Sequence, residues 1–328
     1  PGLVRNRAEI RQGRSIMKYG LLSGILWGID TVVLGIALGM GLYVGNAHAS
    51  FVSACMHDIF AALILLVWMG ARGRLSDTLA AIKTRNGQVI MLAALLGGPI
   101  GMSGYLAAIE HIGPGYTAAI SAFYPAVGTL LAVLVLKERM QVKQVGMLLL
   151  ALFAIVCIGW SSTTGGTMDN PLAGIFGALL CVAGWGSEAV ILAWGMSGEA
   201  VDNETALQIR ETTSALAYVA VVMPLSGSLG SFTQLAFTPE NAVVALAALA
   251  GVGSYLFYYK AIDSIGAARG MALNISYSAW AVLISALILH VIPSTLEIVC
   301  CIVIIVGTVL SATPDWGEFL VSSRKKEE

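Results

Sequence analysis

The chain has 328 residues, of which 57% are hydrophobic and 11% are charged, and its mean hydropathy is +0.83. A soluble domain carries about 25% charged residues, and a core of this size could not hide so much apolar surface. The composition therefore excludes a soluble globular protein and predicts an all-α polytopic membrane protein. The net charge of −1 excludes nothing by itself, but the placement of the charges is informative.

Ten apolar segments are long enough to cross a bilayer, because a helical span needs about 20 residues. They lie at 17–40, 49–70, 88–109, 115–136, 143–161, 171–195, 206–226, 242–262, 267–289 and 294–312. They divide the chain into a cytoplasmic N-terminal segment (1–16), a first five-helix repeat (17–161), a second five-helix repeat (162–312) and a cytoplasmic tail (313–328).

All 18 Lys and Arg residues fall on one side of the predicted membrane. They occupy the N-terminal segment, the loops after spans 2, 4 and 8, the start of span 7 at Arg210, and the C-terminal end. Because cytoplasmic loops carry the excess of basic residues, we expect both termini in the cytoplasm of a bacterial cytoplasmic-membrane protein. No Lys or Arg falls in the middle of a predicted span, which predicts a neutral or negative central cavity.

A tetrad of Trp, Gly, any residue and a carboxylate occurs twice, as Trp27-Gly28-Ile29-Asp30 and Trp185-Gly186-Ser187-Glu188. Other polar and aromatic residues pair at an offset of 153: His57-Asp58 with Arg210-Glu211, Tyr105 with Tyr258, and Tyr124 with Tyr277. Each half holds an odd number of spans, so the second copy must enter the membrane inverted. Inverted repeats place the substrate near the midplane and permit alternating access.

A carboxylate inside a membrane span is costly and is therefore a functional-site hypothesis. A Trp three residues before it lies on the same helix face, so the pair offers an organic cation a π-face and a negative charge. Asn274, Tyr277 and Trp280 follow at three-residue spacing and predict a further stripe. The candidate substrate-binding residues are Trp27, Asp30, Tyr124, Trp185, Glu188, Tyr255, Asn274, Tyr277 and Trp280.

Titratable residues within the spans are candidates for proton coupling, because a buried carboxylate exchanges a proton for a bound cation. These candidates are Asp30, His57, Asp58 and Glu188. His57 has three interpretations: it orients Asp58, relays protons, or hydrogen-bonds a backbone carbonyl. Arg210-Glu211 is either a helix-end pair holding the inner gate or a solvated face.

No metal-ligand spacing and no phosphate-binding glycine loop occurs, and the five cysteines all lie within apolar runs as packing residues. We therefore expect no metal, no cofactor, no catalytic residue and no nucleic-acid partner. The expected partners are the lipid bilayer and a small cationic or zwitterionic organic solute.

Ten spans in two halves, with Lys137-Glu138-Arg139 closing span 4, resemble the drug/metabolite transporter superfamily of the EamA type. Further short stretches are similar to the lic-operon choline permeases: Gly20 to Gly28, His57-Asp58, Gly98 to Met102, Ser121 to Pro125, Gly184 to Glu188, and Leu273 to Trp280. The resemblance implies choline import, with substrate contacts at Trp27, Trp185, Glu188, Tyr277 and Trp280. Asp30 departs from the family pattern, which leaves room for a betaine or a polyamine.

Two rival functions remain open from the sequence. The first is an exporter of amino acids or of aromatic or cationic metabolites on the same fold, which would need a donor such as Asn274 for a substrate carboxylate. The second is an intramembrane enzyme, for which His57-Asp58 is the candidate pair, although no nucleophile accompanies it.

Overall fold

The structure, a computed structural model, describes residues 7–161, 170–199 and 201–316, and every regular element within these ranges is a helix. In chain order the helices are α1 (Arg7–Leu38), η1 (Gly41–Tyr43), α2 (Ala49–Ala71), α3 (Leu75–Ala81), α4 (Arg85–Leu95), η2 (Leu96–Met102), α5 (Ser103–Ser121), α6 (Tyr124–Leu131), η3 (Ala132–Leu136), α7 (Val142–Ser161), α8 (Pro171–Met196), η4 (Ser197–Glu199), α9 (Asn203–Ala217), η5 (Tyr218–Val222), α10 (Met223–Leu225), α11 (Leu229–Leu235), α12 (Asn241–Ile265), α13 (Ala267–Asn274), α14 (Tyr277–Ile288) and α15 (Thr295–Ala312).

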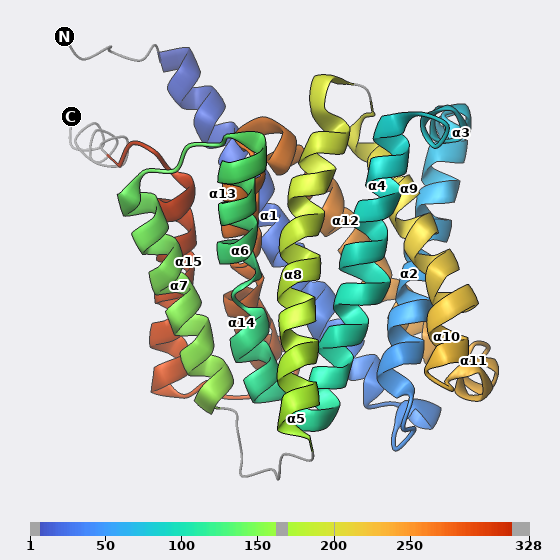
Figure 1. Cartoon of the computed structure of the whole chain (residues 1–328). Helices are drawn as coiled ribbons and strands as arrows, with labels where there is room; N and C mark the ends of the chain where they lie inside the picture. Colours follow the sequence, from blue (N-terminus) through green and yellow to red (C-terminus); the bar gives the residue numbers. More distant parts are fainter. Residues whose placement is uncertain (1–6, 162–169, 200, 317–328) are drawn as a thin grey trace.

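Nine helical segments within the described ranges are long and apolar enough to cross a membrane. They are 17–38, 49–71, 85–113, 115–136, 142–161, 171–196, 241–265, 267–288 and 295–312. Each coincides with a predicted span to within four residues, so the prediction of an all-α membrane protein is confirmed. The one remaining predicted span, span 7 (206–226), corresponds to α9, η5 and α10, which follow one another beside α2 and α4 (Figure 1). This segment is more polar than the others because α9 carries Arg210 and Glu211.

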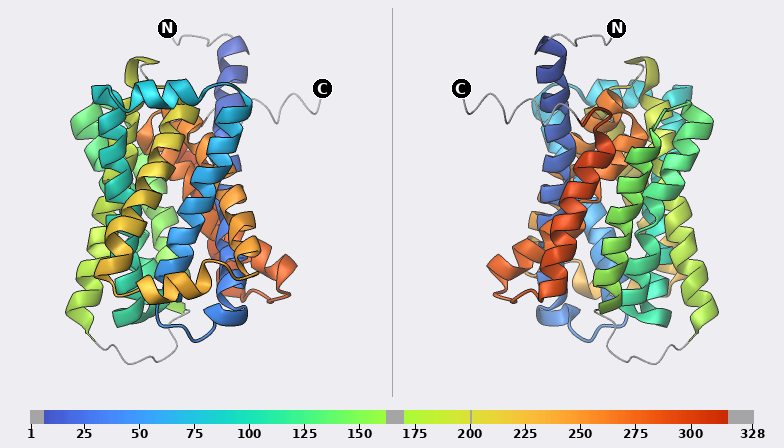
Figure 2. Two further views of the ribbon diagram at one scale, coloured as in Figure 1. Left: turned by 90° about the vertical axis from the view of Figure 1, so that its right-hand side faces the viewer. Right: turned by 90° about the vertical axis from the view of Figure 1, so that its left-hand side faces the viewer.

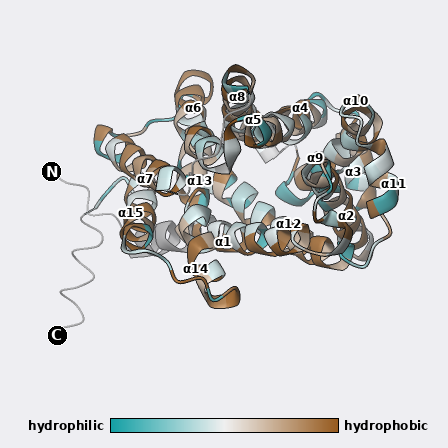
Figure 3. Ribbon diagram, turned by 90° about the horizontal axis from the view of Figure 1, so that it is seen from below, coloured by the Kyte–Doolittle hydropathy of each residue, from teal (hydrophilic) through white to brown (hydrophobic). Residues whose placement is uncertain are grey.

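The helices stand roughly parallel, and successive spans run in opposite directions (Figures 1 and 2). The connection from α2 to α3, the end of η3 and the start of α13 lie at the end of the bundle where α1 begins and α15 ends (Figure 1), and these segments carry Arg72, Arg74, Lys137 and Arg269. We call this the basic end and the opposite one the far end. Figure 3, which views the bundle from the far end, shows hydrophobic residues on the outward faces of the helices, as lipid contact requires.

Two glycine turns occupy matching places in the two halves of the chain. Gly113 joins the third and fourth spans at the far end with φ 81° and ψ 162°, and Gly266 joins α12 to α13 at the basic end with φ 92° and ψ 160°. This backbone region is essentially restricted to glycine. Residues 113 and 266 are 153 positions apart, so the register that pairs the aromatic residues also pairs these two turns. Equivalent turns at opposite ends are what an inverted repeat requires.

Close helix contacts depend on glycine where the two halves meet. A Cβ on Gly104 of α5 would approach the carbonyl oxygen of Gly177 of α8 to 2.6 Å, and a Cβ on Gly177 would approach that of Gly104 equally closely. Small residues let membrane helices pack backbone to backbone in this way. The contact fixes α5 against α8 and so positions the side chains that face the centre of the bundle.

Candidate functional site

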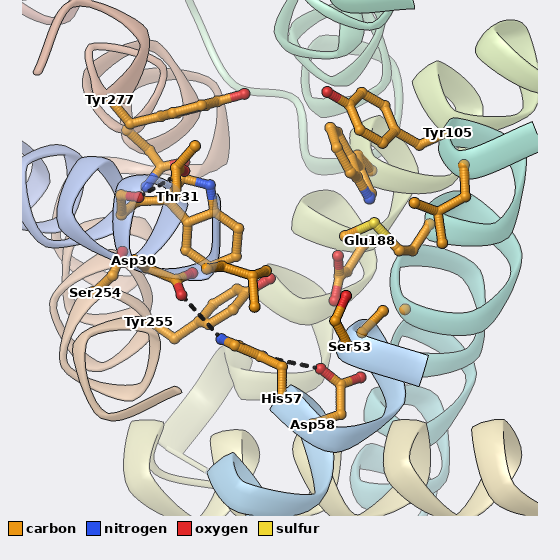
Figure 4. A pocket seen from close by; sticks show the side chains of 18 of the residues that line it. Asp30, Thr31, Ser53, His57, Asp58, Tyr105, Glu188, Ser254, Tyr255 and Tyr277 are labelled. Atoms are coloured by element: carbon orange, nitrogen blue, oxygen red, sulfur yellow. Dashed lines mark hydrogen bonds and ion pairs between the residues drawn. The ribbon is translucent and has the colours of Figure 1, made fainter. Parts of the chain in front are cut away.

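A cavity of about 310 Å³ lies at the centre of the bundle and receives side chains from both halves of the chain (Figure 4). This volume is typical of a pocket for a small organic ligand. Eight of the nine candidate substrate residues line it: Trp27, Asp30, Tyr124, Trp185, Glu188, Tyr255, Asn274 and Tyr277. Tyr105, Tyr258, His57, Asp58 and Arg210 also line it.

Two groups of aromatic rings face one another across the pocket. Trp27 of α1 packs edge-on against Tyr255 at 5.0 Å and against Tyr277 at 6.4 Å between ring centroids. Trp185 of α8 packs edge-on against Tyr124 at 5.6 Å and lies at 5.4 Å from Tyr105. The two tetrad tryptophans therefore each anchor one aromatic group, one from each half of the chain.

The π-helix η2 determines how Trp185 and Glu188 are held. Its wider turn contains Pro99, and the indole Nε1–H of Trp185 donates to the carbonyl oxygen of Gly97 at 3.0 Å. Gly97 also packs against Glu188, because a Cβ at this position would collide with the Glu188 carboxylate. The absence of a side chain at Gly97 thus allows the acid to lie against the η2 backbone.

Tyr124 and Asn274 form a second polar link across the two halves. The Tyr124 hydroxyl donates to the Asn274 side-chain oxygen at 3.4 Å, and the Asn274 amide donates to the Ser23 hydroxyl at 2.6 Å. Both ends of the Asn274 amide are therefore engaged by protein groups.

Trp280 is the exception among the candidate substrate residues, because it does not line the pocket. The side chain of Trp280 packs against Gly28 of α1 instead. A Cβ at Gly28 would lie only 2.9 Å from the Cβ of Trp280. The predicted stripe fails because the chain is not one continuous helix here: α13 ends at Asn274 and α14 begins at Tyr277. A three-residue step also falls about 60° short of a full helical turn, so the stripe drifts away from the pocket.

The first charged group joins α1 and α2. His57 lies between two carboxylates (Figure 4), with Nε2 at 3.2 Å from Oδ1 of Asp30 and Nδ1 at 3.4 Å from Oδ1 of Asp58. The Ser214 hydroxyl donates to the other oxygen of Asp58 at 2.5 Å. Asp30, His57 and Asp58 are all buried. The structure therefore brings together three of the four residues predicted as candidates for proton coupling.

The second charged group centres on Arg210 of α9. Its Nε–H donates to Glu188 at 3.0 Å, its Nη1 to Glu211 at 2.9 Å, and its Nη2 to the Tyr255 hydroxyl at 3.1 Å. Its guanidinium carbon also lies 4.7 Å from the centre of the Tyr255 ring. All three guanidinium nitrogens are thus engaged by protein groups.

The expectation that no basic side chain enters the central cavity is wrong. α9 begins at Asn203, where Asp202 caps it, so Arg210 lies about two turns inside the helix rather than at its end. Arg210 and Glu211 are buried, which also excludes the solvated-face interpretation and a position at the helix end. Three carboxylates that line the pocket (Asp30, Asp58 and Glu188) nevertheless outnumber the one guanidinium (Arg210), a formal charge of −2 when these four groups are ionised and His57 is neutral. The predicted negative character of the cavity therefore survives the correction.

An ion-pair network, which we call the clasp, closes the basic end between α2 and α9. Arg72 pairs with Glu204, and Arg74 pairs with Asp77 at 2.8 Å, with Asp202 at 2.6 Å and with Glu204 at 2.6 Å. The hydrogen bond to Asp77, followed by that to Asp202, raises the pKa of Arg74 above its ordinary value. The network fixes the start of α9 to the end of α2.

The pocket continues from the charged cluster toward the far end. Its lining there includes Leu34 and Leu38 of α1, Ser50 of α2 and Ile109 of α5. The clasp lies at the other end, and none of its residues lines the pocket. The pocket therefore extends from the charged cluster toward the far end of the bundle and does not reach the clasp.

The pocket residues that sequence reasoning missed are Tyr105, Tyr258 and Arg210. The register of the repeat held the signal for the two tyrosines, since they pair at the same offset as Tyr124 and Tyr277. Arg210 pairs with His57 in that register, and His57 lies in a predicted span. Within the described ranges, no group of three or more His, Cys, Asp and Glu side chains is arranged to hold a metal ion.

Comparisons with known proteins agree with this architecture. The model of the EamA-like transporter family matches residues 14–160 and 172–313. Protein LicB of Haemophilus influenzae is 31% identical over 195 residues, which span 58% of this chain and 63% of that protein. A solved crystal structure with 16% sequence identity superposes with a TM-score of 0.67 over 91% of this chain and 96% of the other, which supports the fold alone. The chain belongs to the EamA-like transporter family, and this membership agrees with the expectation of a transporter rather than an enzyme.

Proposed function

We propose that the protein is a secondary transporter that imports choline, or a closely related small quaternary amine, by alternating access. The transported cation lies between the two aromatic groups, with Trp27 and Trp185 as its principal contacts. Glu188 and Asp30 supply negative charge next to the rings. A quaternary ammonium has no N–H to donate, so aromatic faces and nearby carboxylates solvate it better than hydrogen-bond acceptors would.

The observation that carries this proposal is the combination of rings and excess acid in one buried pocket. Arg210 offsets one of the three carboxylates that line the pocket, and its three nitrogens already have acceptors. A substrate anion would have to displace Glu188, Glu211 or Tyr255 from it, whereas a cation meets uncompensated negative charge. The resemblance of the sequence motifs to the lic-operon choline permeases supports choline as the cation.

The membrane orientation follows from the charges at the two ends of the bundle. The basic end faces the cytoplasm under the positive-inside rule, which places both termini there and the protein in the bacterial cytoplasmic membrane. The pocket then faces outward, as an importer requires before it binds substrate. The clasp of Arg72, Arg74, Asp202 and Glu204 is the inner gate, in place of the Arg210-Glu211 pair expected from the sequence.

Alternating access would exchange the arrangements of two inverted repeats, residues 17–161 and 162–312. The two ranges matched by the family model and the paired turns at Gly113 and Gly266 support this division. Rocking one repeat against the other would open the clasp and close the far end.

Binding to the purified protein tests the function. We expect choline to bind, with a Trp185→Ala substitution weakening it about thirtyfold, because one desolvated cation–π contact contributes about 2 kcal/mol. Trp160→Ala is the matched control, since Trp160 is 61% exposed and lies outside the pocket. Trp27→Ala tests the opposite wall of the cage.

Competition against choline, with binding to the purified protein measured by calorimetry, identifies the substrate class. Ethanolamine should compete weakly because its ammonium remains better solvated by water, and betaine weakly because its carboxylate meets the acidic cluster. Displacement by aromatic amino acids without any choline binding would instead support the exporter of amino acids or metabolites. Choline binding undiminished in Trp185→Ala would rule out the cage.

A further inference from the structure

The two charged groups at the pocket are equivalent under the register of the repeat. His57-Asp58 and Arg210-Glu211 are 153 positions apart, whereas Asp30 and Glu188, which end the two tetrads, are 158 apart because the connection after the first span is five residues longer than its counterpart. Each group therefore consists of a tetrad carboxylate, a base and the carboxylate that follows the base in sequence. We call them the His57 triad (Asp30, His57, Asp58) and the Arg210 triad (Glu188, Arg210, Glu211).

The contacts within the triads match as well as their sequence positions. The base reaches the tetrad carboxylate at 3.2 Å in the His57 triad and at 3.0 Å in the Arg210 triad. It reaches the following carboxylate at 3.4 Å and 2.9 Å, respectively. The triads meet where Nη1 of Arg210 lies 3.9 Å from Asp58.

Two glycines extend the equivalence to the neighbouring helices. A Cβ on Gly251 of α12 would lie 2.9 Å from Nε2 of His57, and a Cβ on Gly98 of η2 would collide with the Ser214 hydroxyl that donates to Asp58. Residues 98 and 251 are also 153 positions apart. Each repeat thus presses a glycine backbone against the charged cluster.

The triads differ in the chemistry of the base. Imidazole gains and loses a proton within the physiological range, whereas guanidinium stays protonated in proteins. The Arg210 triad therefore keeps a constant positive charge at its centre, and the His57 triad is able to change its charge by one.

The surroundings of His57 favour a proton-binding role over a purely structural one. Both ring nitrogens face carboxylates, so the imidazolium form would donate two charge-assisted hydrogen bonds, whereas the neutral form can donate only one. The further charged or titratable groups around the triad come from the packed helices: Arg210 and Glu211 of α9, Glu188 of α8, Tyr218 of η5, Tyr255 of α12 and Cys55 of α2. Most of these are acidic or neutral, and Arg210 is already shared among other partners.

We propose that the His57 triad is the proton-binding site linked to transport, and that the Arg210 triad is its counterpart, whose central guanidinium keeps a fixed positive charge. This inference rests on the proposed function, since it requires a cationic substrate in the pocket. A cation beside Asp30 and Trp27 repels the imidazolium, so binding the substrate expels the proton from His57. The event is a simple acid dissociation: the N–H bond breaks, the imidazole keeps the electron pair, and the proton passes to water. Glu188, a candidate proton site by sequence, is assigned to the substrate cation instead.

Calorimetry of choline binding in buffers of different ionisation enthalpy measures the linked proton directly. The full-length protein should release up to one proton per choline at any pH where His57 is protonated in the free protein and neutral in the complex. His57→Gln, which keeps a hydrogen-bonding amide but cannot titrate, should bind choline with no linked proton. His48→Gln is the matched control, because His48 lies outside the pocket lining, and it should leave the proton release intact.

Exchanging the bases between the triads tests their equivalence. Arg210→His should add a second linked proton, and the double substitution His57→Arg with Arg210→His should move the single linked proton to the other triad. Proton release that persists in His57→Gln, proton uptake in place of release, or choline binding without any linked proton in the unaltered protein would overturn the proposal. If the larger substitutions do not yield folded protein, His57→Gln alone decides the question.

The failure of the proposed function gives a different result, namely no heat of choline binding at any pH. Nitrogen-15 spectra of the four histidines then test the proton site without a ligand. A His57 resonance that changes protonation state within the pH range over which the protein stays folded supports the site, and one that does not titrate in that range contradicts it.

Discussion

Replacing Arg210 by Gln removes the positive charge from the buried cluster and leaves Glu188 and Glu211 without their partner. The side chains of Arg210, Glu188 and Glu211 are 6%, 9% and 1% exposed, so water screens the pair very little. Removing one member of a buried ion pair typically costs about 3–5 kcal/mol, because the remaining charge stays buried without compensation. We expect Arg210→Gln to lower the free energy of unfolding by about this amount.

Reversible unfolding in detergent micelles measures this loss, and its pH dependence identifies the cause. Protonation neutralises the orphaned carboxylates, so the loss should shrink as the pH falls from about 8 to about 5. The double substitution Arg210→Gln with Glu211→Gln should recover part of the stability. Arg74→Gln is the control: its side chain is 27% exposed, and exposed ion pairs contribute only about 0–1 kcal/mol each. A loss for Arg210→Gln no greater than that for Arg74→Gln would refute the reasoning.

Further predictions concern the turn, the π-helix and the clasp. Gly266→Ala should destabilise the protein by about 1–3 kcal/mol in the same unfolding assay, since its backbone region is essentially restricted to glycine; an unchanged midpoint would contradict this. Gly97→Ala should weaken choline binding at least about tenfold in calorimetry, because the new methyl group collides with Glu188 and displaces the carboxylate. Glu204→Gln removes the carboxylate that both clasp arginines share, so the inner gate should open more often. A cysteine introduced at Leu192 should then react up to about fivefold faster with a maleimide applied from the cytoplasmic side. An unaltered reaction rate would count against the clasp as the inner gate.

Hydrophobicity alone determines most of the membrane topology, which is why the predicted spans agree with the helices of the structure. The bilayer requires a continuous apolar helix wherever the chain meets lipid, and the sequence records that requirement directly. The register of the repeat carried more information than the spans did. It aligned Tyr105 with Tyr258 and His57 with Arg210 before any contact was visible, and all four line the pocket.

The burial of Arg210 could not be predicted from the sequence, because hydrophobicity does not tell how deep in the membrane a polar helix lies. The first half of predicted span 7 (206–226) is too polar to be recognised as membrane-embedded, so Arg210 was placed at the start of that span. In the structure its charge is satisfied by Glu188 of α8 and by Glu211, and only tertiary packing brings Glu188 within reach. The register of the repeat was the available signal, because it pairs Arg210 with His57, which lies in a predicted span.

The prediction that Trp280 contacts the substrate was wrong for a different reason, which concerns local geometry. The stripe assumed an unbroken helix from Asn274, but the chain leaves α13 and starts α14 within three residues. A small rotation at such a break redirects every later side chain. Gly28 provides the space that accepts Trp280, on a face of α1 outside the pocket.

Comparison of choline with 3,3-dimethyl-1-butanol tests the central claim most directly, since the two molecules have nearly the same shape but only choline is charged. Calorimetry on the purified protein should give binding of choline at least about thirtyfold tighter than that of the neutral alcohol, because the rings and the acidic cluster act on the charge. Equal affinity for the two molecules would contradict the account, since the pocket would then select shape and apolar surface rather than positive charge.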